Sequence, residues 1–496
     1  MKGIMLQGTS SDVGKSFLVT ALCAFFRKQG LKVTPFKSQN MSNNSYITFD
    51  HKEIGRAQGI QAEAAGIAAT VYMNPILLKP RTDMTAEVIL FGKSYHSFSG
   101  RDYRTEFYEL GLKAIKQSLQ ELDKEYELVV IEGAGSPVEM NLNDRELVNM
   151  KVAELADVPV ILVADIDRGG VFASIVGTLA LLNEEEKKRV NGIIINKFRG
   201  DLSLFEDGVK WIEDYTGVSV LGVFPYIHNH MVDGEDSLSI SSRFLGRDQQ
   251  EIDLVVIKLP YISNYTDVEP FSYESDVSVR FVEHEDDFGH PDALILPGTR
   301  STIADLHYLK SVGLDKKIKN YATNGGFIFG ICGGYQIMSK SLVDEAGSDT
   351  GIIGNTVEGL SILPVNTTFS AIKKTIRNKG ELHQGLGFQS MLIDGYEIHQ
   401  GSTVRDEDAL PFLGLEDGEK DGCWINDGRI IGTYFHHIFH HDQWRSAWLN
   451  RIREKKGIPN QEPIVVHDLK ELQYDQLALY VEKHLNVAEL SRIVKY

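Results

Sequence analysis

The sequence has 496 residues, of which 42% are hydrophobic and 24% are charged, and its formal net charge is −18. A chain of this length exceeds one ordinary hydrophobic core, so we expect two or three domains. The negative charge argues against nucleic acid or an anionic membrane as a partner, although a small anionic ligand needs only local positive charge.

Cysteine usage and hydropathy indicate a cytoplasmic protein. Cys23, Cys332 and Cys423 lie far apart in the sequence, which argues against a disulfide framework and a cysteine-based zinc site. The N-terminus shows no signal-peptide pattern, and no apolar run approaches the roughly 18 residues that a spanning helix needs.

Short apolar runs alternate with helical patterns in the first half of the chain. Near-continuous apolar strands separated by helices predict a parallel sheet that is buried on both faces. The predicted strands are Ile4–Gln7, Lys32–Phe36, Leu128–Glu132, Val158–Ala164, Gly192–Asn196 and Ser219–Val223. The predicted helices are Lys15–Lys28, Glu53–Ala69, Thr105–Leu122 and Val171–Leu182.

A second α/β alternation begins after a polar segment. We assign residues 1–235 to a first domain, 236–250 to a linker, 251–450 to a second α/β domain and 451–496 to a helical C-terminal extension. We expect this extension to pack on the second domain. The predicted strands of the second domain lie within Glu251–Pro260, Asp292–Gly298, Gly325–Gly334 and Arg429–His437.

The stretch "GTSSDVGKS", residues 8–16, follows the first predicted strand and opens the first predicted helix. It is one residue longer than the usual P-loop, and Thr9 stands where that pattern has glycine. Backbone N–H groups of such a loop bind phosphate, its lysine adds charge and its serine holds Mg²⁺. A chance Gly-Lys-Ser is the alternative, but the preceding strand favours an ATP site. The expected ATP-binding residues of this loop are Gly8, Thr9, Ser10, Asp12, Gly14, Lys15 and Ser16.

This loop resembles that of dethiobiotin synthetase and its relatives, which use ATP to activate a carboxylate. The resemblance implies that Glu132, in "VVIEGAGSP", is a Mg²⁺ ligand together with Ser16. It also implies that Asn196, in "INKFRGD", lies near the adenine. A strand-end acid without a role is the alternative for Glu132.

Two further polar stretches follow predicted strands, where open α/β sheets bind ligands. In "FKSQNMSNNSYIT", Lys37 suits a phosphate, and Gln39 and Asn40 suit carboxylate or amide groups. A plain solvated loop is the alternative. In "ADIDRGG", Asp165 and Arg168 face metal, phosphate or an acyl acceptor, and the sequence does not decide which.

The second domain contains a candidate nucleophile. "GFIFGICGGYQ" predicts a strand that breaks at Cys332 before a helix, and the small residues around it permit the strained turn that exposes a nucleophile. A helix N-terminus favours the thiolate, and the adjacent N–H suits an oxyanion. An inert buried cysteine is the alternative.

A thiolate nucleophile needs a base, and "GTYFHHIFHH" offers four histidines at the end of a predicted strand. We assign the base to His436. The pairs His436/His440 and His437/His441 have the spacing of a helical metal pair, which is the alternative, but no helical carboxylate or cysteine companion supports a metal site.

Together these features resemble a class I glutamine amidotransferase domain, in which a cysteine attacks glutamine and frees ammonia. "LPGTRST", Leu296–Thr302, falls where that family has its oxyanion loop. The family's His-x-Glu pattern is broken by Ile438. We therefore predict a Cys332–His436 dyad without an orienting carboxylate, and slow glutamine hydrolysis until the acceptor is bound.

The fold class is thus α/β, with an N-terminal P-loop parallel-sheet domain and a C-terminal class I glutamine amidotransferase domain. Further motifs, "IGRAQGIQAEAAG", "MNPILLKP", "EGAGSPVEMNL" and "YEIHQG", extend a resemblance to the cobyric acid synthase family over nearly the whole chain. The resemblance implies amidation of several peripheral carboxylates of a corrinoid, adenosylcobyrinic acid a,c-diamide, with Mg-ATP and glutamine.

For this acidic substrate we predict a local pocket that contains Lys37, Arg56, Lys79 and Arg168. The alternatives are the related a,c-diamide synthase, another amidating ligase, and a ParA/MinD-type ATPase switch. Such a switch has no need of Cys332. The sequence leaves the oligomeric state open.

Overall fold

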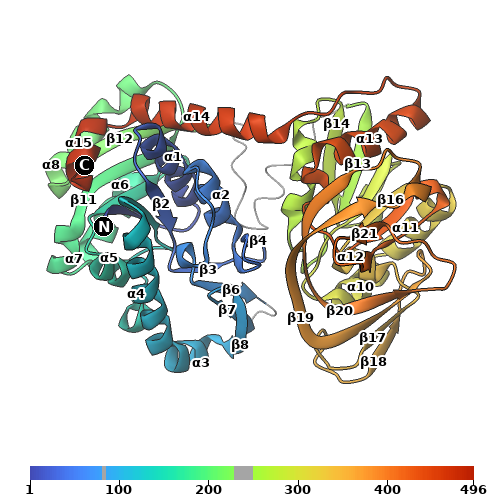
Figure 1. The fold of residues 1–496 in the computed structure, drawn as a ribbon. Helices are drawn as coiled ribbons and strands as arrows, with labels where there is room; N and C mark the ends of the chain where they lie inside the picture. Colours follow the sequence, from blue (N-terminus) through green and yellow to red (C-terminus); the bar gives the residue numbers. More distant parts are fainter. Residues whose placement is uncertain (81–84, 228–249, 496) are drawn as a thin grey trace. The chain divides into compact units, whose positions relative to one another are not determined.

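The computed structural model of the protein describes residues 1–80, 85–227 and 250–495. The chain divides into two compact units, which Figure 1 shows: unit 1 is Met1–Glu235 with His467–Tyr496, and unit 2 is Asp236–Val466. Of the expected linker at 236–250, only residue 250 lies within the described residues.

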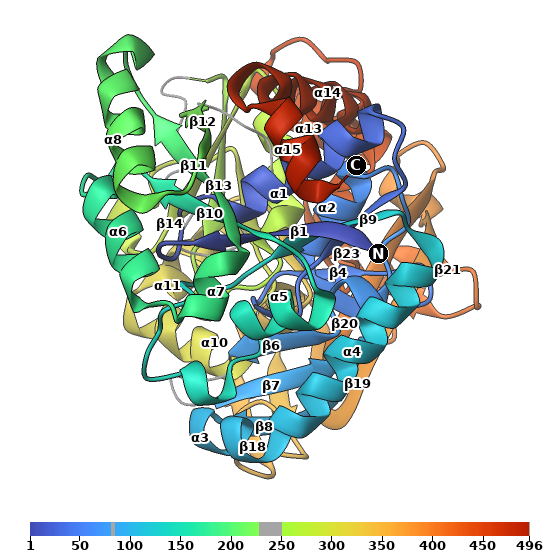
Figure 2. The same ribbon diagram turned by 90° about the vertical axis from the view of Figure 1, so that its left-hand side faces the viewer.

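A six-stranded sheet forms the centre of unit 1 (Figure 2). All neighbouring strands are parallel in the order β12-β11-β10-β1-β9-β2, so the predicted parallel sheet is confirmed. The strands are β1 (Lys2–Gly8), β2 (Val33–Phe36), β9 (Leu128–Glu132), β10 (Val160–Asp165), β11 (Val190–Phe198) and β12 (Val220–Pro225).

Helices bury both faces of this sheet. Because side chains alternate along a strand, Ile4 and Leu6 of β1 join one core and Met5 joins the other. The first core includes α1 (Lys15–Lys28) and α2 (Arg56–Ala64). The second includes α4 (Tyr108–Glu125), α5 (Met150–Ala156), α6 (Val171–Leu181) and α8 (Glu206–Thr216).

Small strands between β2 and α4 were not predicted. The segment expected to be a loop contains β3 (Gln39–Met41) and β4 (Ser45–Ile47), and Glu53–Gly55, expected to be helical, is strand β5. Here β4 pairs with β5, and β3 pairs with β6 in a sheet ordered β3-β6-β7-β8. That sheet is completed by β6 (Ile76–Pro80), β7 (Thr85–Leu90) and β8 (Lys93–Ser99).

The C-terminal helices α14 (Val466–His484) and α15 (Val487–Val494) pack within unit 1 from His467 onward. Leu477 and Val481 join the core that contains α1, and Arg27 forms an ion pair with Glu471 at 2.7 Å. The prediction that the extension packs on the second domain is therefore wrong for these helices. A helix with an apolar stripe packs where a matching apolar face is available, and α1 provides it.

Unit 2 is built on a second six-stranded sheet, ordered β14-β13-β15-β16-β24-β23. Its first five strands are parallel and β23 is antiparallel. The four predicted strands lie in this sheet, and β14 was not predicted. The strands are β13 (Ile252–Ile257), β14 (Val277–Val282), β15 (Ala293–Leu296), β16 (Phe327–Ile331), β23 (Cys423–Ile425) and β24 (Ile430–Thr433). The helices include α10 (Thr302–Ser311), α11 (Leu314–Thr323), α12 (Gly333–Ile337) and α13 (Asp442–Lys456).

A further sheet of unit 2, not predicted from the sequence, lies between α12 and β23 in the chain. It contains the long antiparallel pair β19 (Val365–Leu382) and β20 (Leu392–Arg405). Its other strands are β17 (Ser341–Asp344), β18 (Asn355–Glu358), β21 (Leu413–Leu415) and β22 (Lys420–Asp421). Among the helices in the described part of the chain, none is long and apolar enough to cross a membrane.

Candidate active sites

The glycine loop of unit 1 joins β1 to α1 and folds over its own lysine. Gly14 adopts a φ of 92°, which favours glycine, directly before the helix. The Lys15 Nζ donates to the carbonyl oxygens of Ser10 and Gly135, each at 3.2 Å. A Cβ on Gly8 would lie 2.7 Å from the Ser10 carbonyl oxygen, so the loop needs glycine there to hold this shape. The loop therefore has the closed backbone that cradles phosphate.

Glu132 lies at the end of β9 and collects three side chains around its buried carboxylate. Its Oε1 accepts from the Ser16 hydroxyl and the Lys37 Nζ, both at 2.8 Å, and its Oε2 accepts from the Gln61 amide at 2.6 Å. The carboxylate is 1% exposed, so the Lys37 ammonium offsets much of the cost of burying it. The predicted partners Ser16 and Glu132 thus lie within one hydrogen bond of each other.

This pair fits a magnesium ion. Mg²⁺ in nucleotide sites takes one or two protein oxygens and completes its shell with phosphate and water. The Ser16 hydroxyl and the Glu132 carboxylate supply two such oxygens beside the glycine loop. Among the described residues there is no group of three His, Cys, Asp or Glu side chains that would hold a metal without phosphate.

Gln39 and Asn40, predicted to bind substrate, point to opposite sides of β3. Asn40 is buried and donates to Gln58 at 3.1 Å, whereas Gln39 is half-buried and accepts from the Tyr103 hydroxyl at 2.5 Å. Gln39 thus lies nearer the surface, and a substrate role for either residue stays a prediction.

The structure does not place Arg56 and Lys79 on an open surface. Lys79 is 1% exposed, and its Nζ contacts Glu53 at 2.5 Å and the Ser45 hydroxyl at 2.7 Å. Arg56 is also buried, and its guanidinium lies 5.7 Å from the centre of the Tyr46 ring. The Lys79–Glu53 ion pair links β6 to β5, and the Ser45 hydroxyl adds β4 to the same contact.

Arg168, the fourth member of the predicted pocket, is separate from the buried pair. It follows β10 and is exposed, and its guanidinium lies 3.6 Å from Asp12 of the glycine loop. Asn196, expected near the adenine, donates to the Val13 carbonyl at 2.7 Å. Arg168 and Asn196 therefore both contact the glycine loop.

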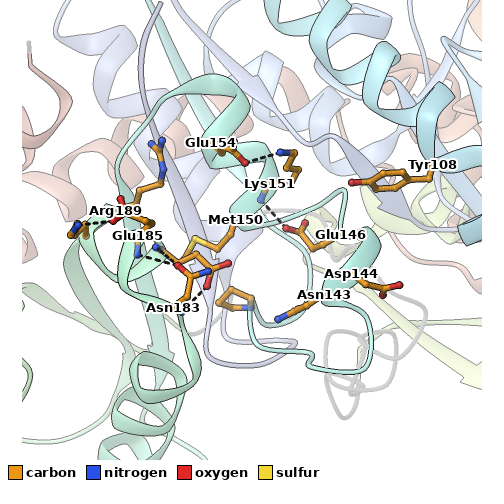
Figure 3. A pocket seen from close by; sticks show the side chains of 13 residues that line it. Tyr108, Asn143, Asp144, Glu146, Met150, Lys151, Glu154, Asn183, Glu185 and Arg189 are labelled. Carbon is orange, nitrogen blue, oxygen red and sulfur yellow. Dashed lines mark hydrogen bonds and ion pairs between the residues drawn. The ribbon is translucent and has the colours of Figure 1, made fainter.

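A pocket of about 730 Å³ lies elsewhere on unit 1, lined mainly by α5 and α7 (Glu184–Arg189) (Figure 3). Its lysines carry carboxylate partners: Lys151 pairs with Glu154 at 2.8 Å and Lys188 with Glu185 at 2.6 Å. Because these charges are balanced, the pocket attracts phosphate less than the glycine loop does.

In unit 2, Cys332 occupies a strained turn between β16 and α12. Its φ of 52° and ψ of −109° lie outside the usual regions, as expected for a nucleophile held at a strand-to-helix elbow. Its N–H donates to the Thr433 carbonyl at 2.8 Å, which fixes the turn. A Cβ on Gly333 would lie 2.4 Å from the Thr299 Cγ2, so the helix start packs directly against the predicted oxyanion loop.

His436 lies three residues after the end of β24 and is completely buried, and its imidazole has a carboxylate partner. Its Nδ1 lies 2.6 Å from Asp267 Oδ2, and Asp267 Oδ1 accepts from the His437 N–H at 2.8 Å. Asp267 belongs to the 3₁₀ helix η6 (Tyr265–Tyr273). The prediction of a dyad without an orienting carboxylate is therefore wrong.

Charge around His436 keeps its imidazole protonated. Burial alone lowers the pKa, but Asp267 and Cys332 outweigh it and raise the pKa of His436 to about 10. The imidazolium thus places a positive charge in contact with the Cys332 side chain. Asn264 lies on the other side of the ring, with its amide nitrogen 3.5 Å from Nε2.

The other histidines of "GTYFHHIFHH" have structural partners. His440 Nε2 lies 3.0 Å from the Thr266 carbonyl oxygen, and His441 Nδ1 accepts from the Trp444 N–H at the start of α13. The His437 and His440 rings stack with centres 4.2 Å apart. These contacts hold the segment that carries His436 against η6 and α13.

Sequence reasoning missed two residues that complete the sites. Gln61 lies one helical turn after Gln58, on the same face of α2, and this pair of amides was a usable signal. Asp267 stands 169 positions before His436, and no spacing rule connects them.

Comparisons with known proteins match each half of the chain to a known domain family. Residues 4–233 match the family described as the CobQ/CobB/MinD/ParA nucleotide binding domain, and residues 253–444 match the CobB/CobQ-like glutamine amidotransferase domain. A cobyric acid synthase of Anoxybacillus flavithermus is 50% identical, covering 99% of this chain and 96% of the relative. Cobyric acid synthases of Geobacillus thermodenitrificans and Desulforamulus reducens are 47% and 46% identical, each covering 99% of this chain and 98% of the relative. With two matching domains and relatives this similar over their whole length, the chain belongs to the cobyric acid synthase family.

Proposed function

We propose that the protein amidates the b, d, e and g side-chain carboxylates of adenosylcobyrinic acid a,c-diamide to give adenosylcobyric acid in cobalamin biosynthesis. ATP activates each carboxylate, and glutamine supplies the ammonia. The observation that carries this proposal is the presence, in one chain of this family, of a buried Cys332–His436–Asp267 group and a phosphate loop joined to Glu132.

Unit 1 would activate the carboxylate. The backbone N–H groups of the glycine loop and the Lys15 ammonium bind the phosphates. Ser16 and Glu132 would hold Mg²⁺, which supplies Lewis-acid charge to the transferring phosphoryl group. Lys37, which pairs with Glu132 at 2.8 Å, would add positive charge beside the phosphates. The substrate carboxylate oxygen attacks the γ-phosphate and ADP leaves. Ammonia then attacks the carbonyl carbon of the acyl phosphate, and the amide forms as inorganic phosphate and a proton leave.

Unit 2 would generate the ammonia. The Cys332 thiolate attacks the side-chain amide carbon of glutamine, and the oxyanion forms beside the Gly333 N–H and the 297–299 loop. His436 gives its proton to the departing ammonia, which leaves a glutamyl thioester. A water molecule then attacks the thioester, His436 takes its proton, and glutamate and the thiolate are released. Asp267 keeps the imidazole oriented throughout.

Two alternatives differ in testable ways. A ParA/MinD-type switch uses the same phosphate chemistry, but the buried imidazolium–carboxylate pair in unit 2 has no place in its cycle. The related a,c-diamide synthase would act on two other carboxylates of the same ring system. The relatives, which match over nearly their full length and are cobyric acid synthases, favour the proposed amidation of the b, d, e and g carboxylates.

Mass spectrometry of adenosylcobyrinic acid a,c-diamide after incubation with the protein, Mg-ATP and glutamine tests the proposal. Each carboxylate converted to an amide lowers the mass by about one unit, because NH₂ replaces OH. We expect a stepwise decrease that ends at one product with all four carboxylates amidated. If the mass of the corrinoid does not change while glutamine is still hydrolysed, the proposed substrate is wrong and the enzyme amidates another carboxylate.

A further inference from the structure

Four exposed apolar side chains of unit 1 lie on segments that contact one helical turn, residues 103–107. Met41, Tyr95, Met140 and Leu142 are 57%, 53%, 58% and 44% exposed, and we call them the apolar rim. Large apolar side chains that gather on a surface mark a binding site more often than isolated ones do.

The apolar rim is organised by η2 (Tyr103–Phe107), a π-helical turn between α3 (Gly100–Asp102) and α4. Such turns within helices are frequent at functional sites. The Tyr103 ring stacks on Phe107 with centres 4.9 Å apart, and Tyr95 lies 6.0 Å from the same Phe107 ring. In both ribbon views β8 and α3 lie side by side (Figures 1 and 2).

Met41 lies on β3, and this strand contacts η2 through Gln39. Gln39 and Met41 are two residues apart and lie on one face of the strand, and the Tyr103 hydroxyl donates to Gln39 at 2.5 Å. Burial raises the pKa of Tyr103, so the phenol keeps the proton that this bond requires.

Met140 and Leu142 reach the same turn through Arg104. Its guanidinium donates to the carbonyl oxygens of Asn141 at 3.1 Å and Leu142 at 3.3 Å. The loop that carries Met140 and Leu142 is therefore fixed next to Tyr103.

Two segments that carry rim residues begin beside the Glu132 carboxylate, where we propose that the substrate carboxylate is activated. The loop follows β9, whose last residue is Glu132, and Gln39 comes two residues after Lys37, which contacts Glu132 at 2.8 Å. Met41 follows Lys37 by four residues, which span at most about 14 Å of extended chain. A ring-sized ligand that extends from Met41 toward Lys37 therefore places a peripheral carboxylate within reach of the site that activates it.

Charged side chains of both signs border the rim, among them Arg145 and the exposed Glu139 and Asp144. Arg145 is exposed, and its guanidinium donates to the Arg104 carbonyl oxygen at 2.9 Å. Arg104 also pairs with the exposed Asp144. A flat apolar ring with carboxylates around its edge matches this combination of apolar and cationic groups.

We propose that the apolar rim binds the corrin ring of the substrate, with Met41, Met140 and Leu142 against the ring and Arg145 beside its peripheral carboxylates. This inference rests on the proposed function and names the substrate-binding surface within it. It assigns to Arg145 the contact with substrate charge that the sequence suggested for Arg56 and Lys79, whose side chains are buried.

The test is the double substitution Met140→Ser/Leu142→Ser in the full-length protein. We expect the KM for adenosylcobyrinic acid a,c-diamide, and the Kd measured by ultrafiltration and corrin absorbance, to rise about tenfold. Arg145→Gln should raise both about fivefold, in line with the loss of one charge contact. The KM for ATP and the rate of glutamine hydrolysis should not change. The matched control is Leu479→Ser, an equally exposed leucine on α14 at 51% exposure, which should leave every constant unchanged.

The possible results separate the two proposals. If the unmodified protein neither binds nor amidates the corrinoid, the proposed function fails and the rim assignment fails with it. If the unmodified protein is active and the double variant keeps its KM, only the rim assignment is wrong. If the double variant changes the oligomeric state in light scattering and keeps its KM, the rim is a contact between copies of this chain.

Discussion

The two candidate sites differ in how their side chains are supported. In the phosphate site, the groups that would bind nucleotide and metal also bind one another: Ser16 and Lys37 both contact Glu132. In the thiol site, Asp267 lies behind His436, away from the atom that would meet substrate. One site is a network of direct binding groups, and the other has a separate supporting residue.

This difference predicts which substitutions abolish a reaction and which only lower its rate or shift its pH dependence. Changing any member of the phosphate network alters both a binding group and the partner that it holds. In the thiol site the nucleophile and its support can be changed one at a time, and their effects on rate and on pH dependence are distinct.

The largest effect is expected from Cys332→Ser. Losing the nucleophile should lower glutamine-dependent amidation about 10⁶-fold, because the glutamyl thioester cannot form. Amidation with ammonium salts should continue at its normal rate, since unit 1 is unchanged. Product formation from each nitrogen source measures this. Persistence of glutamine-dependent amidation in the variant would remove Cys332 from the mechanism.

Asp267→Asn tests the supporting residue while keeping the shape of the side chain. Losing the carboxylate charge should lower the kcat of glutamine hydrolysis about 10³- to 10⁴-fold, as for other triads that lose their acid. Because Asp267 raises the pKa of His436 to about 10 against the effect of burial, its removal lets that pKa fall. The alkaline limit of activity should therefore move to lower pH.

The pH–rate profile of glutamine hydrolysis measures that shift, and Asp267→Glu, which keeps the charge, should restore part of the alkaline limit. A lower rate with an unmoved alkaline limit would mean that Asp267 only holds the fold. Stability should respond in the same sense. The raised pKa of His436 stabilises the folded protein fully below pH about 6.5, and this contribution is lost as pH rises through about 10.

Glu132→Gln tests the phosphate network. The amide keeps the volume but removes a metal ligand and the partner of Lys37, so amidation from glutamine and from ammonia should both fall about 10²- to 10³-fold. The Mg²⁺ concentration for half-maximal rate should rise, whereas glutamine hydrolysis should not change. Glu184→Gln, at an exposed position of α7, is the matched control. An unchanged requirement for Mg²⁺ would contradict the metal assignment.

The same contrast explains what the sequence could predict. The glycine loop and the Cys332 elbow are each formed by one unbroken stretch of sequence, so residue spacing alone indicates their geometry. The structure confirms both turns. Asp267 meets His436 only because η6 packs against the segment after β24, and no local pattern encodes that contact.

The fold shows the same limit. Long apolar strands of the parallel sheets are predicted correctly because burial on both faces leaves a continuous apolar run. Short, polar strands such as β3 and β4 resemble loops in sequence and form through their neighbours. The apolar stripe of α14 predicts that the helix packs, but it does not say that α1 is the partner.

The smallest effect on activity is expected from Asp421→Asn, which asks whether the support of the thiol site extends one layer further. Asp421 is buried and accepts from the Thr433 hydroxyl and, at 3.1 Å, from the Tyr434 N–H, two residues before His436. Burial, and then the nearby Glu397, raise the pKa of Asp421 to about 7 in spite of these hydrogen bonds.

A raised carboxyl pKa stabilises the folded protein while the group is protonated. This contribution is complete below the ordinary value of 3.8 and is lost as pH rises through about 7. The asparagine variant lacks this titration. Its free energy of unfolding relative to the unmodified protein should therefore increase between pH 5 and pH 8, by at most roughly a few kcal/mol, and its relative Tm should rise with it. Thermal unfolding at both pH values measures the change. Glutamine hydrolysis should stay within about threefold, because an amide oxygen still accepts one of the two hydrogen bonds. A fall as large as that of Asp267→Asn would instead place Asp421 among the residues that position His436.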